Sequence, residues 1–190
     1  NFKPGKHKSP VLVLNYGLVC SNFHWTKQIE YFEERGYSIL IHDYRGHFQS
    51  SGSDNLESIT FPRIAKDLSL IVNKLELKDC ILFGHSMGVN VSLEFVKNYP
   101  EVVSKMVLIS GTIIPVHNIL MNTHLTGPLS PILKNLLETF PKSFKGFWKY
   151  GGWAKPVKAF IRSGGFNTEQ VDYDFIETYL SKLGELGPEL

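Results

Sequence analysis

The feature that most constrains the fold is an alternation of short apolar runs and amphipathic segments between residues 10 and 110. The apolar runs are rich in Val, Ile and Leu and are bounded by Pro, Gly or polar residues, which is typical of strands buried on both faces. Alternation with short connections implies parallel strands joined by right-handed crossovers. The sequence therefore predicts an α/β fold, a parallel sheet with flanking helices. The expected strands are 10–16, 37–42, 80–83 and 104–110, and the expected helices are 26–35, 60–75 and 87–98.

Several residues set the predicted helix ends. Gly36 closes the first helix at the position where a left-handed backbone is common. Thr60 is expected to cap the second helix, and Pro62 falls in its first turn, where a missing N–H costs little. The apolar face of that helix repeats at helical spacing and consists of Ile64, Leu68, Ile71 and Leu75.

The pattern changes after Gly111, and the sequence predicts a partial core over 1–112 and a helical cap or lid over 113–190. Between Glu138 and Glu169 there are six basic residues and no acidic one, interleaved with aromatics. One hypothesis is a lid that meets an anionic lipid surface or an acyl substrate. We favour the other, in which the aromatics pack inward and the lysines stay solvated. In both cases the cap places apolar surface over the site, which suits a partly hydrophobic small-molecule substrate.

Composition excludes several classes of protein. The chain has 190 residues, 43% of them hydrophobic and 20% charged, which is a globular composition. A net charge of +2 gives no reason to expect nucleic acid as a partner. No apolar stretch is long enough for a membrane span. His42, Asp43 and His47 could be metal ligands, but a strand end followed by a turn explains them better, so we expect no metal.

One motif carries chemistry: Gly84-His85-Ser86-Met87-Gly88 fits the pattern G-x-S-x-G. A predicted strand precedes it and a predicted helix follows it, which is the arrangement of a nucleophile elbow. Glycines on both sides remove Cβ atoms that would collide in so sharp a turn. The following helix presents its free N–H groups to the reacting centre.

With two further landmarks, the chain resembles the α/β-hydrolase fold family over residues 10–111. Tyr16-Gly17-Leu18, followed by Ser21 and Trp25, is similar to the family's oxyanion loop after its third strand. Asp43-Tyr44-Arg45-Gly46-His47 is similar to its D-x-R-G-x-G-x-S turn after the fourth strand. The resemblance implies that Ser86 is the nucleophile, that the backbone N–H groups of Leu18 and Met87 form the oxyanion hole, and that no cofactor is needed.

The chain departs from the family pattern at three positions. Tyr16 stands where many relatives have His, Val89 where a further Gly is common, and Phe48 at the second Gly of the fourth-strand turn, so we expect that loop to take another path. Family topology also places Cys20 and Cys80 near opposite ends of neighbouring strands, too far apart for a disulfide. With no signal peptide in residues 1–7, this favours the cytoplasm.

The base and acid of a catalytic triad are harder to find. In this family the order is Ser, acid, His, with the last two on loops after later strands. His117 and His124 fall in the predicted cap, where histidines more often pack or face solvent. Asp172 and Asp174 are better explained as loop or helix-start acids, and His85 points away from its neighbour Ser86. We therefore expect a longer hydrolase, with two strands before residue 1 and two after residue 190.

The sequence thus predicts a serine hydrolase of the esterase or lipase kind, acting on a carboxylic ester or related acyl compound. Ser86, Leu18 and Met87 are the candidate catalytic residues, and the base and acid are expected beyond residue 190. Lactonase, haloperoxidase-like and C–C bond hydrolase chemistries share the elbow and stay open. The alternative, if the chain is truly this short, is a non-catalytic hydrolase-like module that binds a small apolar ligand.

Overall fold

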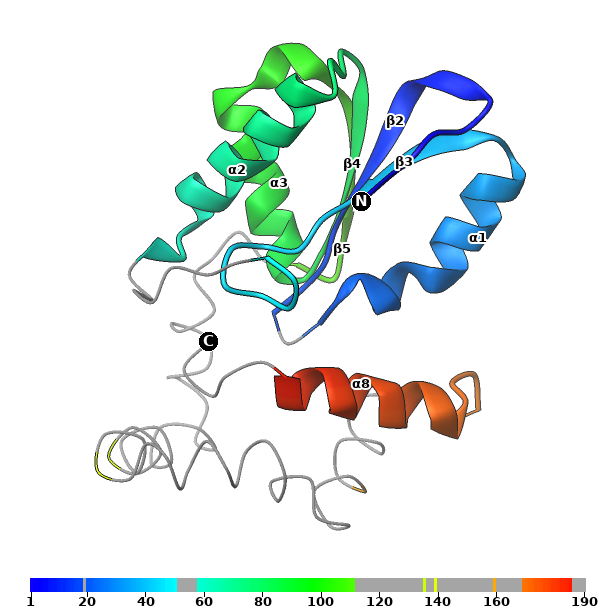
Figure 1. Ribbon diagram of the computed structural model, residues 1–190, viewed down its shortest axis with the longest axis vertical. Coiled ribbons are helices and arrows are strands. Elements are labelled where there is room, and N and C mark those ends of the chain that lie inside the picture. Colours follow the sequence, from blue (N-terminus) through cyan, green and yellow to red (C-terminus); the bar gives the residue numbers. More distant parts are fainter. Residues whose placement is uncertain are drawn as a thin grey trace. The chain divides into compact units, whose positions relative to one another are not determined.

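The computed structural model describes residues 1–18, 20–50, 58–111, 135, 139, 159 and 169–185. The chain divides into two compact units, Asn1–Ile113 and Ile114–Leu190, which are described separately below. The first unit contains a five-stranded sheet with helices on both faces (Figure 1). The second contributes the helix α8.

The sheet has the order β1-β3-β2-β4-β5. Strands β2, β3, β4 and β5 run parallel to one another, as the alternating pattern predicts. Within residues 1–9 no strand was predicted, but β1 lies there and pairs antiparallel with β3. The bounds are β1 Phe2–Lys3, β2 His7–Asn15, β3 Tyr37–Ile41, β4 Cys80–His85 and β5 Val103–Ile109.

The helices begin and end close to the predicted positions: α1 is Thr26–Glu34, α2 is Phe61–Lys74 and α3 is Met87–Asn98. Short 3-10 turns cover Asn22–Trp25 and Pro100–Val102. Gly36 has φ 78°, the left-handed backbone expected after the first helix. The prediction for Thr60 was wrong in its detail: the residue stands at the N-cap, but its side chain makes no capping hydrogen bond, and only its carbonyl accepts from Ile64 N at 2.9 Å.

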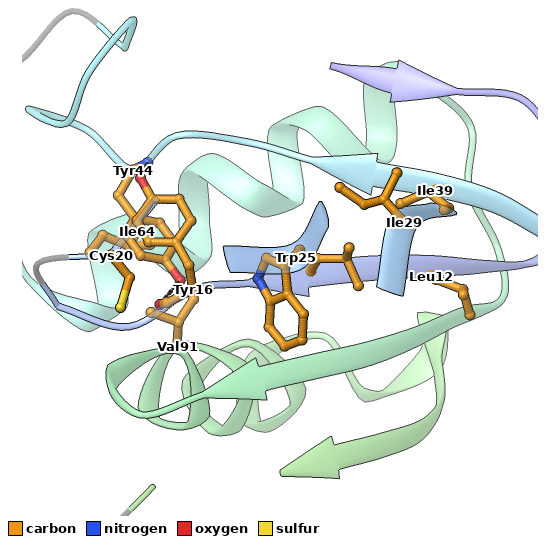
Figure 2. Close-up of a cluster of buried hydrophobic side chains, with 10 residues drawn as sticks. Leu12, Tyr16, Cys20, Trp25, Ile29, Ile39, Tyr44, Ile64 and Val91 are labelled. Atoms are coloured by element: carbon orange, nitrogen blue, oxygen red, sulfur yellow. Dashed lines mark hydrogen bonds between the residues drawn. The ribbon is translucent and has the colours of Figure 1, made fainter. Parts of the chain in front are cut away.

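Helices cover both faces of the sheet because each buried strand alternates side chains between two apolar layers. Figure 1 shows α1 on one side and α2 with α3 on the other. Leu12 and Ile39 face the α1 side with Trp25 and Ile29 (Figure 2). The layer under α2 and α3 consists of Val11, Val13, Leu40, Ala65, Leu68, Val72, Cys80, Leu82 and Phe95.

Cys80 pairs in register with Val11 at the start of β4, while Cys20 follows the far end of β2. Both are free, buried thiols. Strand β5 pairs with β4 on one side and with no other strand among the described residues. Its residues Met106, Val107, Leu108 and Ile109 are exposed.

In the second unit, helix α8 spans Tyr173–Glu185. Ile176 and Leu180, one turn apart, form its buried face. Asp172 and Asp174 are exposed at its N-terminal end, where acids favour the helix dipole, in line with their interpretation as helix-start residues. None of the helices in the described ranges combines the length and the apolar character that a membrane span needs.

Candidate active site

Ser86 occupies the sharp turn between β4 and α3, as the motif predicts. Its backbone has φ 53° and ψ −119°, a conformation that residues with a Cβ rarely adopt. Such strain costs about 1–3 kcal/mol and persists only where surrounding contacts impose it. Here the Ser86 N–H donates to Ile109 O at 2.9 Å, and its carbonyl accepts from Val89 N at 3.0 Å. The turn is thus held from β5 and from the first turn of α3.

The flanking glycines let this turn approach the sheet. A Cβ on Gly84 would lie 2.7 Å from the carbonyl oxygen of Gly88. A Cβ on Gly88 would overlap the carbonyl oxygen of Asn15, at the end of β2. The first turn of α3 therefore packs backbone against backbone, and the expected reason for both glycines is confirmed.

The loop after β2 touches the nucleophile directly. A Cβ on Gly17 would lie only 2.8 Å from Ser86 Cβ, so the backbone of this loop passes beside the serine. Leu18 follows, with its side chain 44% exposed. Met87 is the first residue of α3, so its N–H has no acceptor within the helix. The two backbone segments proposed to carry the oxyanion donors thus both adjoin Ser86.

Tyr16 is fully buried and joins this loop to the turn after β3. Its hydroxyl accepts from Tyr44 N at 3.1 Å and donates to Asp43 Oδ1 at 3.4 Å, and the Tyr44 hydroxyl donates to Tyr16 O at 2.7 Å. The two rings lie side by side, 4.4 Å between centroids (Figure 2). Burial raises the pKa of both phenols, so both stay protonated and act as structural donors.

Asp43 also accepts from Asn22 Nδ2 at 2.9 Å, which adds a second link between the same two loops. In the turn after β3, Arg45 makes a bidentate pair with Asp67 of α2 at 2.7 and 2.6 Å. Phe48, the residue expected to divert this turn, has a left-handed φ of 45°, and its ring packs near Tyr16 at 6.2 Å between centroids.

A cavity of about 670 Å³ opens beside this turn. Its lining includes Asp43, Arg45 and Asp67 together with apolar residues of α2. Ser86 is not among the lining residues, so this cavity is separate from the nucleophile. The Arg45–Asp67 pair on its wall is already satisfied and is best explained as a clamp between α2 and the turn.

No histidine in the described ranges hydrogen-bonds to Ser86 Oγ. The His85 ring lies against Trp25, 6.4 Å between centroids, and burial lowers its pKa. His47 bonds instead to Arg45 O at 3.1 Å through Nδ1. His117 and His124 lie outside the described residues. The described residues also contain no group of three or more metal-ligating side chains.

Sequence reasoning missed a buried polar chain beneath the elbow. Ser92 Oγ donates to Gly88 O at 2.8 Å and accepts from Asn15 Nδ2 at 2.9 Å. Asn15 Oδ1 lies 2.9 Å from His42 Nε2, which therefore carries the proton. All three polar side chains are buried. The available signal was a polar residue, Asn15, closing an otherwise apolar strand.

Comparison with known proteins finds relatives that match part of the chain. It is 31% identical over 107 residues to Protein ABHD8 of Bos taurus, an alignment that covers 56% of this chain and 25% of that protein. It is 30% identical over 108 residues to the Bifunctional esterase/perhydrolase DCH of Acinetobacter calcoaceticus, covering 56% of this chain and 38% of that protein. The chain thus spans well under half the length of these relatives.

Two solved structures share the fold. An epoxide hydrolase of Bacillus megaterium superposes with a TM-score of 0.70 at 18% identity, over 99% of this chain and 64% of that one. The esterase EaEST of Exiguobacterium antarcticum superposes with a TM-score of 0.65 at 17% identity, over 98% of this chain and 65% of that one. In addition, residues 10–152 match the family described as the alpha/beta hydrolase fold. The chain therefore belongs to the α/β-hydrolase fold family.

Proposed function

We propose that the protein is a serine hydrolase that acts on a carboxylic ester or a related acyl compound. Ser86 Oγ attacks the acyl carbonyl, and the N–H groups of Leu18 and Met87 stabilise the negative charge that develops on its oxygen. The alcohol or other leaving group departs with a proton, and water then attacks the acyl-enzyme to release the acid and regenerate Ser86.

The observation that carries this proposal is the backbone of Ser86. A non-glycine residue at φ 53° on a strand-to-helix turn is costly, and such strain concentrates at functional sites. The approach of Gly17 to Ser86 and the position of Met87 as the first residue of α3 support the assignment of backbone donors at Leu18 and Met87.

A serine needs a base to remove its proton, and an acid commonly orients that base. Since no described histidine hydrogen-bonds to Ser86 Oγ, we place the base and acid outside the described residues. We also propose that residues 113–190 form a helical cap whose apolar surface favours a partly hydrophobic substrate. The esterase named among the relatives is consistent with acyl chemistry, and it supports the substrate class by analogy only.

The test is covalent labelling of the full-length protein with a fluorophosphonate, which reacts with activated serines. We expect one adduct by intact mass, on the peptide that contains Ser86, and none in Ser86→Ala. Ser110→Ala is a matched control, because Ser110 is also a strained serine at a strand end, with φ 49°. It should label like the wild type.

Hydrolysis of p-nitrophenyl esters of increasing acyl length then measures the substrate preference. We expect turnover that disappears in Ser86→Ala and that favours medium over very short acyl chains. A folded, full-length protein that neither labels nor hydrolyses any ester would contradict the proposal. That result would favour the alternative of a hydrolase-like module that binds a small apolar ligand without catalysis.

A further inference from the structure

The hydrogen-bond chain under the elbow joins the two backbone segments that flank Ser86. Asn15 is the last residue of β2, directly before the loop of Gly17 and Leu18. Ser92 lies just over one turn into α3, and its hydroxyl bonds to Gly88 O, in the turn that begins with Met87. The single bond from Asn15 Nδ2 to Ser92 Oγ, 2.9 Å long, therefore connects the two segments.

The surroundings leave this link little freedom. The Ser92 hydroxyl lies close to both elbow glycines: a Cβ on Gly84 would be 2.9 Å from Ser92 Oγ. Asn15 pairs in register with Gly84, and its carbonyl oxygen occupies the space that a Gly88 side chain would need. On its other side, Asn15 is held by buried His42. Burial lowers the pKa of His42 to about 4, so its imidazole is neutral near pH 7 and donates one proton in a fixed direction.

Packing alone does not need these polar groups. A serine within a helix commonly bonds to its own backbone four residues earlier, and that bond adds nothing between elements. Ser92 makes this bond within α3 and also accepts from Asn15 Nδ2 of strand β2. Two apolar side chains of similar volume could fill the same space with little cost in stability. A directional bond between buried groups instead fixes a distance and an angle, because any displacement leaves a buried polar atom unpaired.

We propose that Asn15 and Ser92 are positioning residues that set the spacing between the Leu18 and Met87 N–H groups across Ser86. The inference rests on the proposed function, because it assigns a role within the same site. Backbone donors to a developing oxyanion act through their placement, and a misplacement of about 1 Å can cost a hundredfold in rate. The effect is expected on the covalent step and not on the initial binding.

The experiment measures fluorophosphonate labelling of the full-length protein, resolved into the inactivation rate constant and the reversible binding constant. The variants are Ser92→Ala, Asn15→Leu and the double substitution. Ser69→Ala is the control: Ser69 is also buried in a helix and donates to a carbonyl of its own helix at 2.7 Å, but in α2, away from the elbow. Thermal unfolding of each variant is measured alongside.

We expect each single variant to lower the inactivation rate constant by roughly 10- to 100-fold with an unchanged binding constant. The inactivation rate constant of the double variant should fall no further than that of the more impaired single variant, because both substitutions break the same link. Ser69→Ala should keep the wild-type rate. If Asn15→Leu does not fold, Ser92→Ala decides alone, because alanine fits wherever serine fits.

The inference is overturned if folded Ser92→Ala labels at the wild-type rate, or if only the binding constant changes. It is also overturned if the losses of the two single variants multiply in the double variant. These results leave the proposed function standing, since the wild type still labels at Ser86. A wild-type protein that does not label overturns the proposed function, and this inference with it.

Discussion

The strain at Ser86 predicts an unusual order of stability between two inactive variants. Ser86→Ala removes the hydroxyl but keeps a Cβ at φ 53° and ψ −119°. Ser86→Gly removes both, and glycine reaches positive φ without steric cost. Glycine at position 86 should therefore relieve the backbone strain.

The magnitude follows from two opposing effects. A residue held in a sparsely populated backbone region costs about 1–3 kcal/mol of folding free energy. Glycine is more flexible in the unfolded chain, and this entropy cost on folding cancels about 0.5–1 kcal/mol of the stability gained. We expect Ser86→Gly to be more stable than Ser86→Ala by about 1 kcal/mol. In a domain of this size that raises the midpoint of thermal unfolding by roughly 2–4 °C.

The assay is urea and thermal unfolding of both variants, with fluorophosphonate labelling to confirm that both are inactive. The matched pair is Ser69→Gly and Ser69→Ala in α2, where the backbone is helical. There the order should reverse, because glycine within a helix is about 1 kcal/mol less favourable than alanine. The reasoning is refuted if Ser86→Gly is no more stable than Ser86→Ala while the Ser69 pair shows the usual order.

Three further predictions concern the surroundings of the elbow. Gly88→Ala should destabilise the protein by about 1–3 kcal/mol in urea unfolding and slow labelling, because its Cβ would overlap the Asn15 carbonyl. Burial lowers the pKa of His42 from 6.5 to about 4, so the unfolded chain binds the proton more readily between these pH values. The contribution of His42 to the free energy of unfolding should be complete above pH 6.5 and should decrease toward pH 4 by at most about 3 kcal/mol. In urea unfolding across this pH range, His42→Gln should therefore lose less stability than the wild type. Arg45→Lys should replace two short bonds to Asp67 by one and cost up to about 1 kcal/mol in thermal unfolding, since both side chains are partly exposed.

Controls for these predictions use the same measurements. An unchanged stability of Gly88→Ala would mean that α3 can move away from β2 without cost. A pH profile that is identical in the wild type and His42→Gln would show that other groups dominate the acid response. A loss well above the expected range for Arg45→Lys would indicate that the pair is more strongly coupled than its exposure suggests.

Local pattern was enough to predict most of the core. The apolar runs and the 3.6-residue spacing in 60–75 located β3 and α2 to within a residue or two, because both elements are specified by which side chains face the core. The antiparallel β1 was missed, since two residues carry no periodicity and their pairing with Ile39 and Leu40 is a long-range contact. Thr60 shows the same limit: its position at the helix start was predictable, but the bond of its hydroxyl was not.

At the site, the motif predicted the turn and the need for its glycines. It did not predict what surrounds them. Phe48 has a left-handed backbone and its ring packs near Tyr16 and His47, and local sequence does not reveal these contacts. Asn15 and Ser92 are 77 residues apart, and nothing in their neighbourhoods marks them as partners.

The sequence by itself determined the alternation of strands and helices between residues 10 and 110, the parallel character of the central sheet and the position of a serine on a strand-to-helix turn. These follow from periodicity and from the few residues that tolerate sharp turns, which are local properties. Only the tertiary structure decided which backbone carbonyl Gly88 packs against, that Tyr16 joins two loops, and that a polar chain runs beneath the elbow. Those contacts join residues far apart along the chain, and they arise only when the sheet brings the ends of β2, β3 and β4 together.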